Sequence, residues 1–164
     1  MSLPDDLLEQ ARTIARQDAR RPKQASLRRA VSTGYYALFH FLIAEATIKL
    51  VAIPGLRSKF ARVFEHGIMK EVSRSFGNPN VDVMKLTGGL PIPVDLRFVA
   101  EAFVALQEAR HEADYDPNRN FSKLEVTDAL NKVDQSFESW NRVRDDPVAG
   151  MYLAALMIGK RWNR

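Results

Sequence analysis

The segment 26–50 constrains the fold of this chain more than any other stretch. Apolar residues recur along it at the three- and four-residue spacing of a helix, and between Tyr35 and Ala44 they occupy nearly the whole circumference. A helix that is apolar on all sides has to be covered on all sides, because apolar surface left in water is unfavourable. The segment therefore predicts a long central helix surrounded by other helices.

The remaining periodic segments supply the surrounding helices, and no pair of segments shows the alternation of paired strands. A first helix is expected to begin near Pro4 and to end near Pro22, since the residue before a proline disfavours helical backbone. Further helices are expected over the segments 59–76, 94–115, 122–143 and 148–160. The sequence thus predicts an all-α fold, an antiparallel up-and-down bundle of four to five main helices with an extra C-terminal helix.

Local signals place some of the boundaries within this bundle. Ser122, followed three residues later by Glu125, has the spacing of a capping box and predicts a helix start. The stretch 77–93 is rich in glycine and proline and predicts a long loop. We assign residues 1–144 to the bundle and residues 145–164 to an apolar helix that packs on the bundle or on a dimer partner.

Composition excludes several classes of chemistry. The 164 residues contain no cysteine, which removes disulfides, thiolate nucleophiles and cysteine metal sites and fits a reducing cytoplasm. The three histidines lack the paired spacing of a metal site, and no glycine-rich phosphate loop is present. The apolar run 148–159 is shorter than the ~20 residues that a membrane span needs. We therefore expect a cytoplasmic protein without a metal, a cofactor or a membrane partner.

Basic residues cluster near the N-terminus of the chain, whose net charge is +4. Asp18 is the one acid in the segment 12–29, and the basic residues there are Arg12, Arg16, Arg20, Arg21, Lys23, Arg28 and Arg29. Such a cluster attracts phosphate groups. It also fits an ordinary solvated helix face and turn, and the sequence leaves both interpretations open.

The densest run of ionisable side chains is "EARHEADYDPNRN", residues 108–120. Arg110 lies on the apolar stripe of its helix, so we expect it to point into the bundle and to pair with Asp114, one turn later. His111 and Tyr115 project from roughly the opposite side, where they meet solvent or a second subunit. On these angles the four side chains do not form one cluster.

The helix expected over 26–50 also carries a polar line, which consists of Arg29, Thr33, Tyr36 and His40. If this line faces Arg110 and Asp114, the bundle contains a connected polar seam. The seam fits either a functional site or a hydrogen-bond network that fixes helix register. His66 stands beside Gly67, which favours a local helix irregularity and a structural role for the histidine.

Two stretches together resemble a known family. "SLRRAVSTGYYALFHFLIAEA" is similar to the second helix of bacterial and archaeal HEPN domains (higher eukaryote and prokaryote nucleotide-binding), with matches at Arg29, Ala30, Tyr35, Tyr36, Ala37, Phe39 and His40. "LQEARHEADYD" is similar to the R-x-x-A-D-Y ending of the fourth helix in an uncharacterised branch, with matches at Arg110, Ala113, Asp114 and Tyr115. The His66–Gly67 step resembles a His–Gly step of that branch. The resemblance covers about residues 7–144.

The resemblance implies a helical bundle that usually forms a homodimer, with both copies of the fourth-helix motif in a shared cleft. Many family members are metal-independent endoribonucleases, often the toxin of a toxin–antitoxin pair or part of a defence system. In those members an arginine is followed, after four to six residues, by a histidine. Here Tyr115 stands five positions after Arg110, and the nearby histidine, His111, is adjacent to Arg110.

Three functional hypotheses follow. The first is a dimeric module that binds RNA or a nucleotide, with contacts from Arg28, Arg29, Tyr36, His40 and His66. The second is a metal-independent endoribonuclease whose site comprises Arg110, Asp114, Tyr115 and His111. Such an enzyme needs a base, a proton donor and a cation for the charge that develops on the phosphate. The third is an interaction protein that pairs through its C-terminal helix. The resemblance further implies an antitoxin or a nucleotidyltransferase as partner protein.

Overall fold

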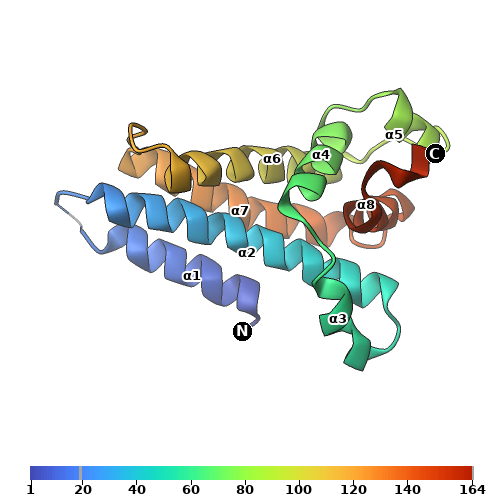
Figure 1. Ribbon diagram of the computed structural model, residues 1–164, viewed down its shortest axis with the longest axis horizontal. Coiled ribbons are helices and arrows are strands. Elements are labelled where there is room, and N and C mark those ends of the chain that lie inside the picture. Colours follow the sequence, from blue (N-terminus) through green and yellow to red (C-terminus); the bar gives the residue numbers. More distant parts are fainter. Residues whose placement is uncertain (19, 164) are drawn as a thin grey trace. The chain divides into compact units, whose positions relative to one another are not determined.

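The computed structural model describes residues 1–18 and 20–163, apart from the side chain of Asn163, and this part of the chain contains helices and no strand (Figure 1). The α-helices are α1 (Leu3–Arg16), α2 (Gln24–Leu50), α3 (Arg57–Ala61), α4 (His66–Gly77), α5 (Val81–Leu86), α6 (Val94–Tyr115), α7 (Lys123–Val143) and α8 (Pro147–Ile158). Two short 3-10 helices are η1 (Pro54–Leu56) and η2 (Gly159–Asn163). The predicted all-α class is confirmed.

The chain divides into two compact units. The first unit comprises residues 1–41 and 105–137, and the second comprises residues 42–104 and 138–164. Three helices are divided between the units, with one part in each; they are α2, α6 and α7.

In the first unit, α1 and the adjoining parts of α2, α6 and α7 run lengthwise beside one another, and successive helices are antiparallel (Figure 1). Arg12 of α1 holds α7 through Asp134, at 3.2 Å between Nη2 and Oδ2. Gly34 of α2 marks a close approach to α7, because a Cβ atom at this position would lie 2.5 Å from Cδ2 of Leu130. The absence of a side chain there leaves room for the Leu130 side chain against the backbone of α2.

In the second unit the core forms around Trp140 and Tyr152, which are fully buried. The Trp140 indole Nε1 donates a 2.7 Å hydrogen bond to Glu45, and the Tyr152 hydroxyl lies 2.8 Å from the Ser73 hydroxyl. Helix α8 contacts α4, and Phe76 of α4 packs on the Tyr152 ring at a centroid distance of 5.0 Å. Within the described residues, no helix combines the length and the apolar character needed to cross a membrane.

The predicted continuous helix over 59–76 is wrong. Helix α3 ends at Ala61 and α4 begins at His66, with a turn between them. Glu65 adopts extended backbone, with φ −119° and ψ 134°, and Phe64 is buried. Burial of the Phe64 ring thus outweighs the local helical periodicity, because burying a phenylalanine side chain contributes about 1.5–3 kcal/mol.

The predicted loop 77–93 contains a helix of its own, α5. The side chain of Asn80 caps it by accepting a 3.0 Å hydrogen bond from the backbone N–H of Val83, and the Val83 side chain is fully buried. The predicted capping box at the start of α7 is confirmed: Ser122 and Glu125 bond reciprocally, at 3.1 Å and 2.7 Å. These caps satisfy backbone N–H groups that have no partner within their helices.

Candidate functional site

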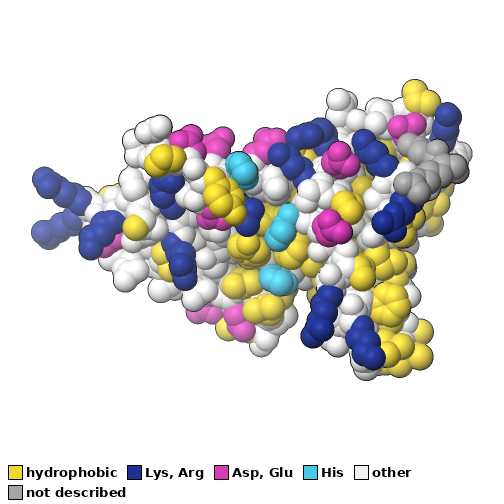
Figure 2. All heavy atoms as spheres, in the orientation of Figure 1, with side chains coloured by type: hydrophobic (Ala, Val, Ile, Leu, Met, Phe, Trp, Pro, Cys, Tyr) yellow, Lys and Arg dark blue, Asp and Glu magenta, His cyan; other side chains and the backbone are white. Residues whose placement is uncertain are grey.

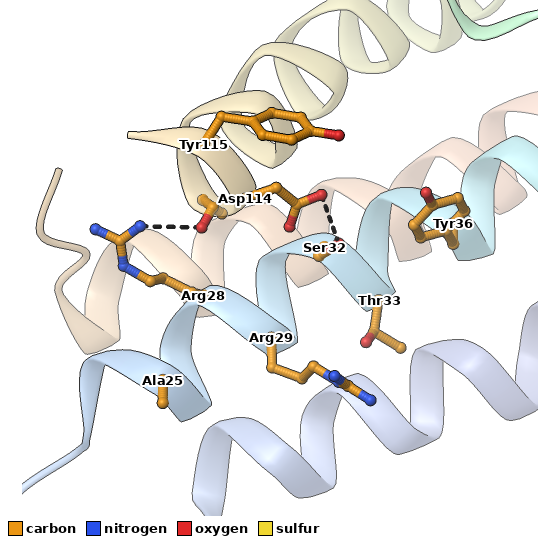
Figure 3. A pocket seen from close by; sticks show the side chains of 9 residues that line it. Ala25, Arg28, Arg29, Ser32, Thr33, Tyr36, Asp114 and Tyr115 are labelled. Carbon is orange, nitrogen blue, oxygen red and sulfur yellow. Dashed lines mark hydrogen bonds between the residues drawn. The ribbon is translucent and has the colours of Figure 1, made fainter. Parts of the chain in front are cut away.

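A cavity of about 680 Å³ lies in the first unit between α2 and the C-terminal end of α6 (Figure 3). We call it the α2–α6 cavity. Polar and apolar surface contribute about equally to its lining, which comprises Ala25, Arg28, Arg29, Ser32, Thr33, Tyr36, Ala113, Asp114 and Tyr115. Its volume is within the range of small-molecule binding sites.

Arg110 anchors the polar groups beside this cavity. Its side chain is only 13% exposed, and its Nη2 donates a 2.9 Å hydrogen bond to the Tyr36 hydroxyl. Its Nε lies 2.9 Å from Oδ2 of Asp114, an ion pair in which the N–H is not aligned for a hydrogen bond. The expected inward orientation of Arg110 and its pairing with Asp114 are therefore both present.

The surroundings of Arg110 keep it charged and keep one neighbouring tyrosine neutral. Burial acts to lower the pKa of Arg110, but the hydrogen bond with Tyr36 and the charge of Asp114 outweigh burial and raise that pKa. Burial raises the pKa of the Tyr35 hydroxyl, although the Arg110 charge opposes the rise. The site thus holds a permanent cation next to a phenol that does not ionise near neutral pH.

Three tyrosine rings surround the Arg110 guanidinium. Its Cζ lies 5.8 Å from the ring centroid of Tyr35, 5.5 Å from that of Tyr36 and 5.8 Å from that of Tyr115. Each distance is within the range of a cation–π contact. Such contacts favour a guanidinium at this position, because the faces of aromatic rings attract a cation.

The expectation that Tyr115 stands apart from Arg110 is wrong, whereas His111 is exposed to solvent as expected and its ring is linked to Arg110 through Tyr115. Tyr115 lies over the Arg110 guanidinium, and the His111 ring packs on Tyr115 at a centroid distance of 5.0 Å. The physical reason is that helical side chains lean towards the N-terminus, so a long tyrosine reaches back over the preceding turn. The run 110–115 therefore forms one connected cluster.

The polar line of α2 faces this cluster, as the predicted polar seam requires. Arg29, Thr33 and Tyr36 line the cavity, and the His40 ring stacks on Tyr36 at a centroid distance of 6.2 Å and an interplanar angle of 29°. Sequence reasoning missed Ser32, whose hydroxyl lies 3.5 Å from Oδ2 of Asp114 (Figure 3). The four-residue spacing from Ser32 to Tyr36 and His40 is the signal that would have found it.

Arg28, which was expected to contact nucleic acid, is used within the fold. Its guanidinium donates to the carbonyl of Ala113 at 3.0 Å (Figure 3). It also donates to the carbonyl of Pro117 at 3.3 Å and to that of Arg119. A cation that caps the last carbonyls of a helix also interacts favourably with the helix dipole. Arg28 therefore fixes the end of α6, although it also lines the cavity.

Arg29 differs from Arg28, because its side chain is exposed and makes no hydrogen bond or ion pair with any described residue. The basic segment 12–29 divides in the same way. Arg12 pairs with Asp134. By contrast, four exposed basic side chains near the α1–α2 turn make no hydrogen bond within the described part of the chain. They are Arg16, Arg20, Arg21 and Lys23. Figure 2 shows Lys and Arg side chains gathered at this turn.

His66 belongs to the second unit, where it is the first residue of α4, and it is not part of the cavity lining. The sequence alone could not show which of His40 and His66 lies near the cavity, because that depends on how the helices pack. The His40 ring stacks on Tyr36 and the His111 ring packs on Tyr115, and both tyrosines line the cavity.

His40 makes the stability of the fold depend on pH. Burial lowers the pKa of His40 below its ordinary value. The unfolded chain therefore takes up a proton first as the pH falls, and the free energy of unfolding is expected to decrease from about pH 6.5 down to the folded pKa. We expect His40→Gln to reduce this decrease. Urea titrations between about pH 7 and pH 5 test it, and parallel curves for the two proteins would contradict it.

Among the described residues, no three His, Asp or Glu side chains lie close enough together to hold a metal ion. Comparison of the chain with protein-family models, with curated proteins and with solved structures finds no match. The proposal that follows therefore depends on the motifs and on the geometry of the α2–α6 cavity.

Proposed function

We propose that this chain is a HEPN-like module that binds RNA or a nucleotide in the α2–α6 cavity. One observation supports the proposal above the others: the unpaired, exposed Arg29 and the 65% exposed ring of Tyr115 border the same cavity. A phosphate needs a cation with free donors, and a nucleobase needs an accessible flat ring. The cavity offers both.

The phosphate contact is assigned to Arg29. Its guanidinium is a planar fork that binds phosphate oxygens through two parallel hydrogen bonds. The hydroxyls of Ser32 and Thr33 lie in the same lining and supply further donors. Arg110 contributes a second positive charge, which Asp114 partly offsets, so Arg29 is the stronger attraction for an anion.

The base contact is assigned to Tyr115. Its ring is 65% exposed and contacts the Arg110 guanidinium and the His111 ring, and His111 is itself exposed. Stacking of a nucleobase on an aromatic side chain contributes about 1–3 kcal/mol and does not depend strongly on sequence. The exposed cations at the α1–α2 turn would guide a polyanion to this site.

Replacement of Arg29 by alanine is expected to weaken binding of a short single-stranded RNA and to reduce the slope of log affinity against log salt concentration by about 1. Fluorescence anisotropy at several salt concentrations measures both quantities. Arg97→Ala is the matched control, because Arg97 is an exposed helical arginine of α6 in the second unit. Absent binding, binding indifferent to salt, or equal losses in both variants would each reject the proposal.

A second candidate function is metal-independent RNA cleavage at the same site. The specific observation in its favour is that His111, Tyr115 and Arg110 form one connected cluster. In such a reaction the ribose 2′-oxygen attacks the phosphorus, a base takes the 2′-hydroxyl proton, and an acid protonates the leaving 5′-oxygen. Arg110 would stabilise the added negative charge, with His111 and Tyr115 as the groups that exchange protons.

A further inference from the structure

The end of α2 and the segment that follows it carry an exposed apolar surface in the second unit. We call residues 46–64 the α2–α3 tip. Its exposed large apolar side chains are Ile48, Leu50, Ile53, Phe60 and Val63, and Ile53 is 61% exposed. Figure 2 shows hydrophobic side chains gathered where Figure 1 draws α3 and the end of α2. An exposed apolar cluster of this kind is typical of an interaction site.

The charges of the tip are all of one sign. Residues 46–64 contain no aspartate or glutamate, and their basic residues are Lys49, Arg57, Lys59 and Arg62. Arg57 donates to the carbonyl of Val51 at 3.1 Å. The exposed side chains of Lys49, Lys59 and Arg62 make no hydrogen bond or ion pair with the described residues. Two copies of this surface would repel each other, so the tip is complementary to an acidic partner.

A cavity of about 410 Å³ adjoins the tip and shares Ile48 and Lys49 with it. Its lining is Glu45, Ile48, Lys49, Trp140, Arg144, Asp145 and Leu153. Glu45 is already neutralised, because both of its oxygens accept hydrogen bonds from Arg144 at 2.9 Å. Trp140 and Leu153 supply an apolar wall, and a cavity of this size admits an apolar side chain.

We propose that the α2–α3 tip binds an acidic amphipathic segment of a partner protein. The apolar side chains of that segment cover Ile48, Ile53 and Phe60, one of them enters the cavity beside Trp140, and its acids meet Lys59 and Arg62. The cavity favours a protein segment over a membrane, because an inserted side chain fills a concave pocket and a lipid surface does not. This surface shares no residue with the α2–α6 cavity.

The test begins with a library of random peptides displayed on phage and selected on the full chain. Enriched peptides are then synthesised with a fluorescent label, and their affinity is measured by anisotropy. We expect acidic sequences with apolar residues at helical spacing, and an affinity that falls about tenfold or more in the double variant Lys59→Glu, Arg62→Glu. The control Arg97→Glu, Lys123→Glu carries the same charge change at exposed positions outside the tip and is expected to bind normally.

A single variant, Ile53→Ser, tests the apolar contact without a change of charge. It is expected to lower the affinity for the enriched peptide while circular dichroism shows an unchanged helix content, because Ile53 is exposed. RNA binding is expected to be normal in every tip variant, which separates this proposal from the function proposed for the α2–α6 cavity.

Several outcomes would overturn the proposal. They are enrichment of no peptide or of basic peptides, an equal loss of affinity in the control double variant, and full affinity in Ile53→Ser. Binding of phosphatidylserine vesicles without peptide binding would assign the tip to a membrane. A lower molecular mass in solution for Lys59→Glu, Arg62→Glu than for the unmodified chain would assign it to a second copy.

Discussion

Replacement of Trp140 by alanine is expected to lower the free energy of unfolding by about 3–5 kcal/mol, the usual cost of truncating a buried large aromatic side chain. Trp140 is fully buried, and its indole N–H donates to Glu45 at 2.7 Å. Alanine would leave a void next to Tyr152, whose ring centroid lies 6.3 Å away. Because domains are typically stable by about 5–15 kcal/mol, the transition in a urea titration would shift to a much lower concentration.

Trp140→Phe separates the packing of this side chain from its hydrogen bond. Phenylalanine keeps much of the ring volume but leaves Glu45 without the indole donor, so the expected cost is about 1 kcal/mol. Trp162→Phe is the matched control, because the Trp162 indole nitrogen has no hydrogen-bond partner among the described residues. Urea titration followed by far-ultraviolet circular dichroism measures all three variants. Equal costs for the two phenylalanine variants would contradict the contribution of the Trp140–Glu45 hydrogen bond, and a cost below about 1 kcal/mol for alanine would contradict the packing described for Trp140.

Helix boundaries could be predicted from the sequence wherever local chemistry marks them. The helix predicted over 94–115 matches α6, because Pro93 and Pro117 flank it. The Ser122–Glu125 pair likewise marks the start of α7. At these boundaries the deciding interactions connect residues that are close together in the chain, so they can be recognised from the sequence alone.

Boundaries that depend on distant residues could not be predicted. The His66–Gly67 step indicated an irregularity near residue 66, but the segment 57–65 contains no proline or glycine to indicate that the helix ends at Ala61. The burial of Phe64 decides that break. Helix α5 is too short for a periodic pattern, and it depends on the burial of Val83. In both cases the energy comes from packing against other elements, which local periodicity does not contain.

In the candidate site, too, local interactions could be predicted from the sequence and long-range ones could not. The Arg110–Asp114 pair could be predicted from its spacing of four residues, and the polar line of α2 indicated Tyr36. The positions of Tyr115 and Arg28 could not be predicted. Tyr115 is placed by the reach of its side chain, which a helical projection ignores. Arg28 is placed by the carbonyls at the end of α6, whose proximity to α2 is a property of the folded chain.

Replacement of Arg110 by alanine is expected to weaken RNA binding by about tenfold or more, a larger effect than that of any other single change at the α2–α6 cavity. The loss would combine three physical changes. The site loses its fixed cation, Asp114 becomes an unpaired negative charge beside the ligand, and Tyr115 loses the guanidinium that supports its ring. An unpaired negative charge repels an anionic ligand, so removal of Arg110 both deletes an attraction and exposes the repulsion from Asp114.

Two further variants separate these contributions. Arg110→Lys keeps the positive charge but not the planar fork, so we expect an intermediate affinity. Arg110→Ala combined with Asp114→Ala removes the exposed repulsion, so part of the affinity should return, and a double-mutant cycle measures the coupling between the two side chains. Thermal unfolding of each variant shows whether the fold persists. Unchanged RNA affinity in a folded Arg110→Ala protein would exclude Arg110 from the binding site.

The same variants decide between binding and cleavage. The unmodified protein and Arg110→Ala are each incubated with single-stranded and structured RNA in the presence of a chelator. The products are then analysed on a gel. Cleavage by the unmodified protein that Arg110→Ala abolishes would favour the ribonuclease, because a cation is then needed for the charge that develops on the phosphate. Intact RNA with both proteins, together with tight binding by the unmodified protein alone, would favour the binding module. Equal cleavage by both would exclude a catalytic role for Arg110, since a group that stabilises the transition state cannot be removed without slowing the reaction.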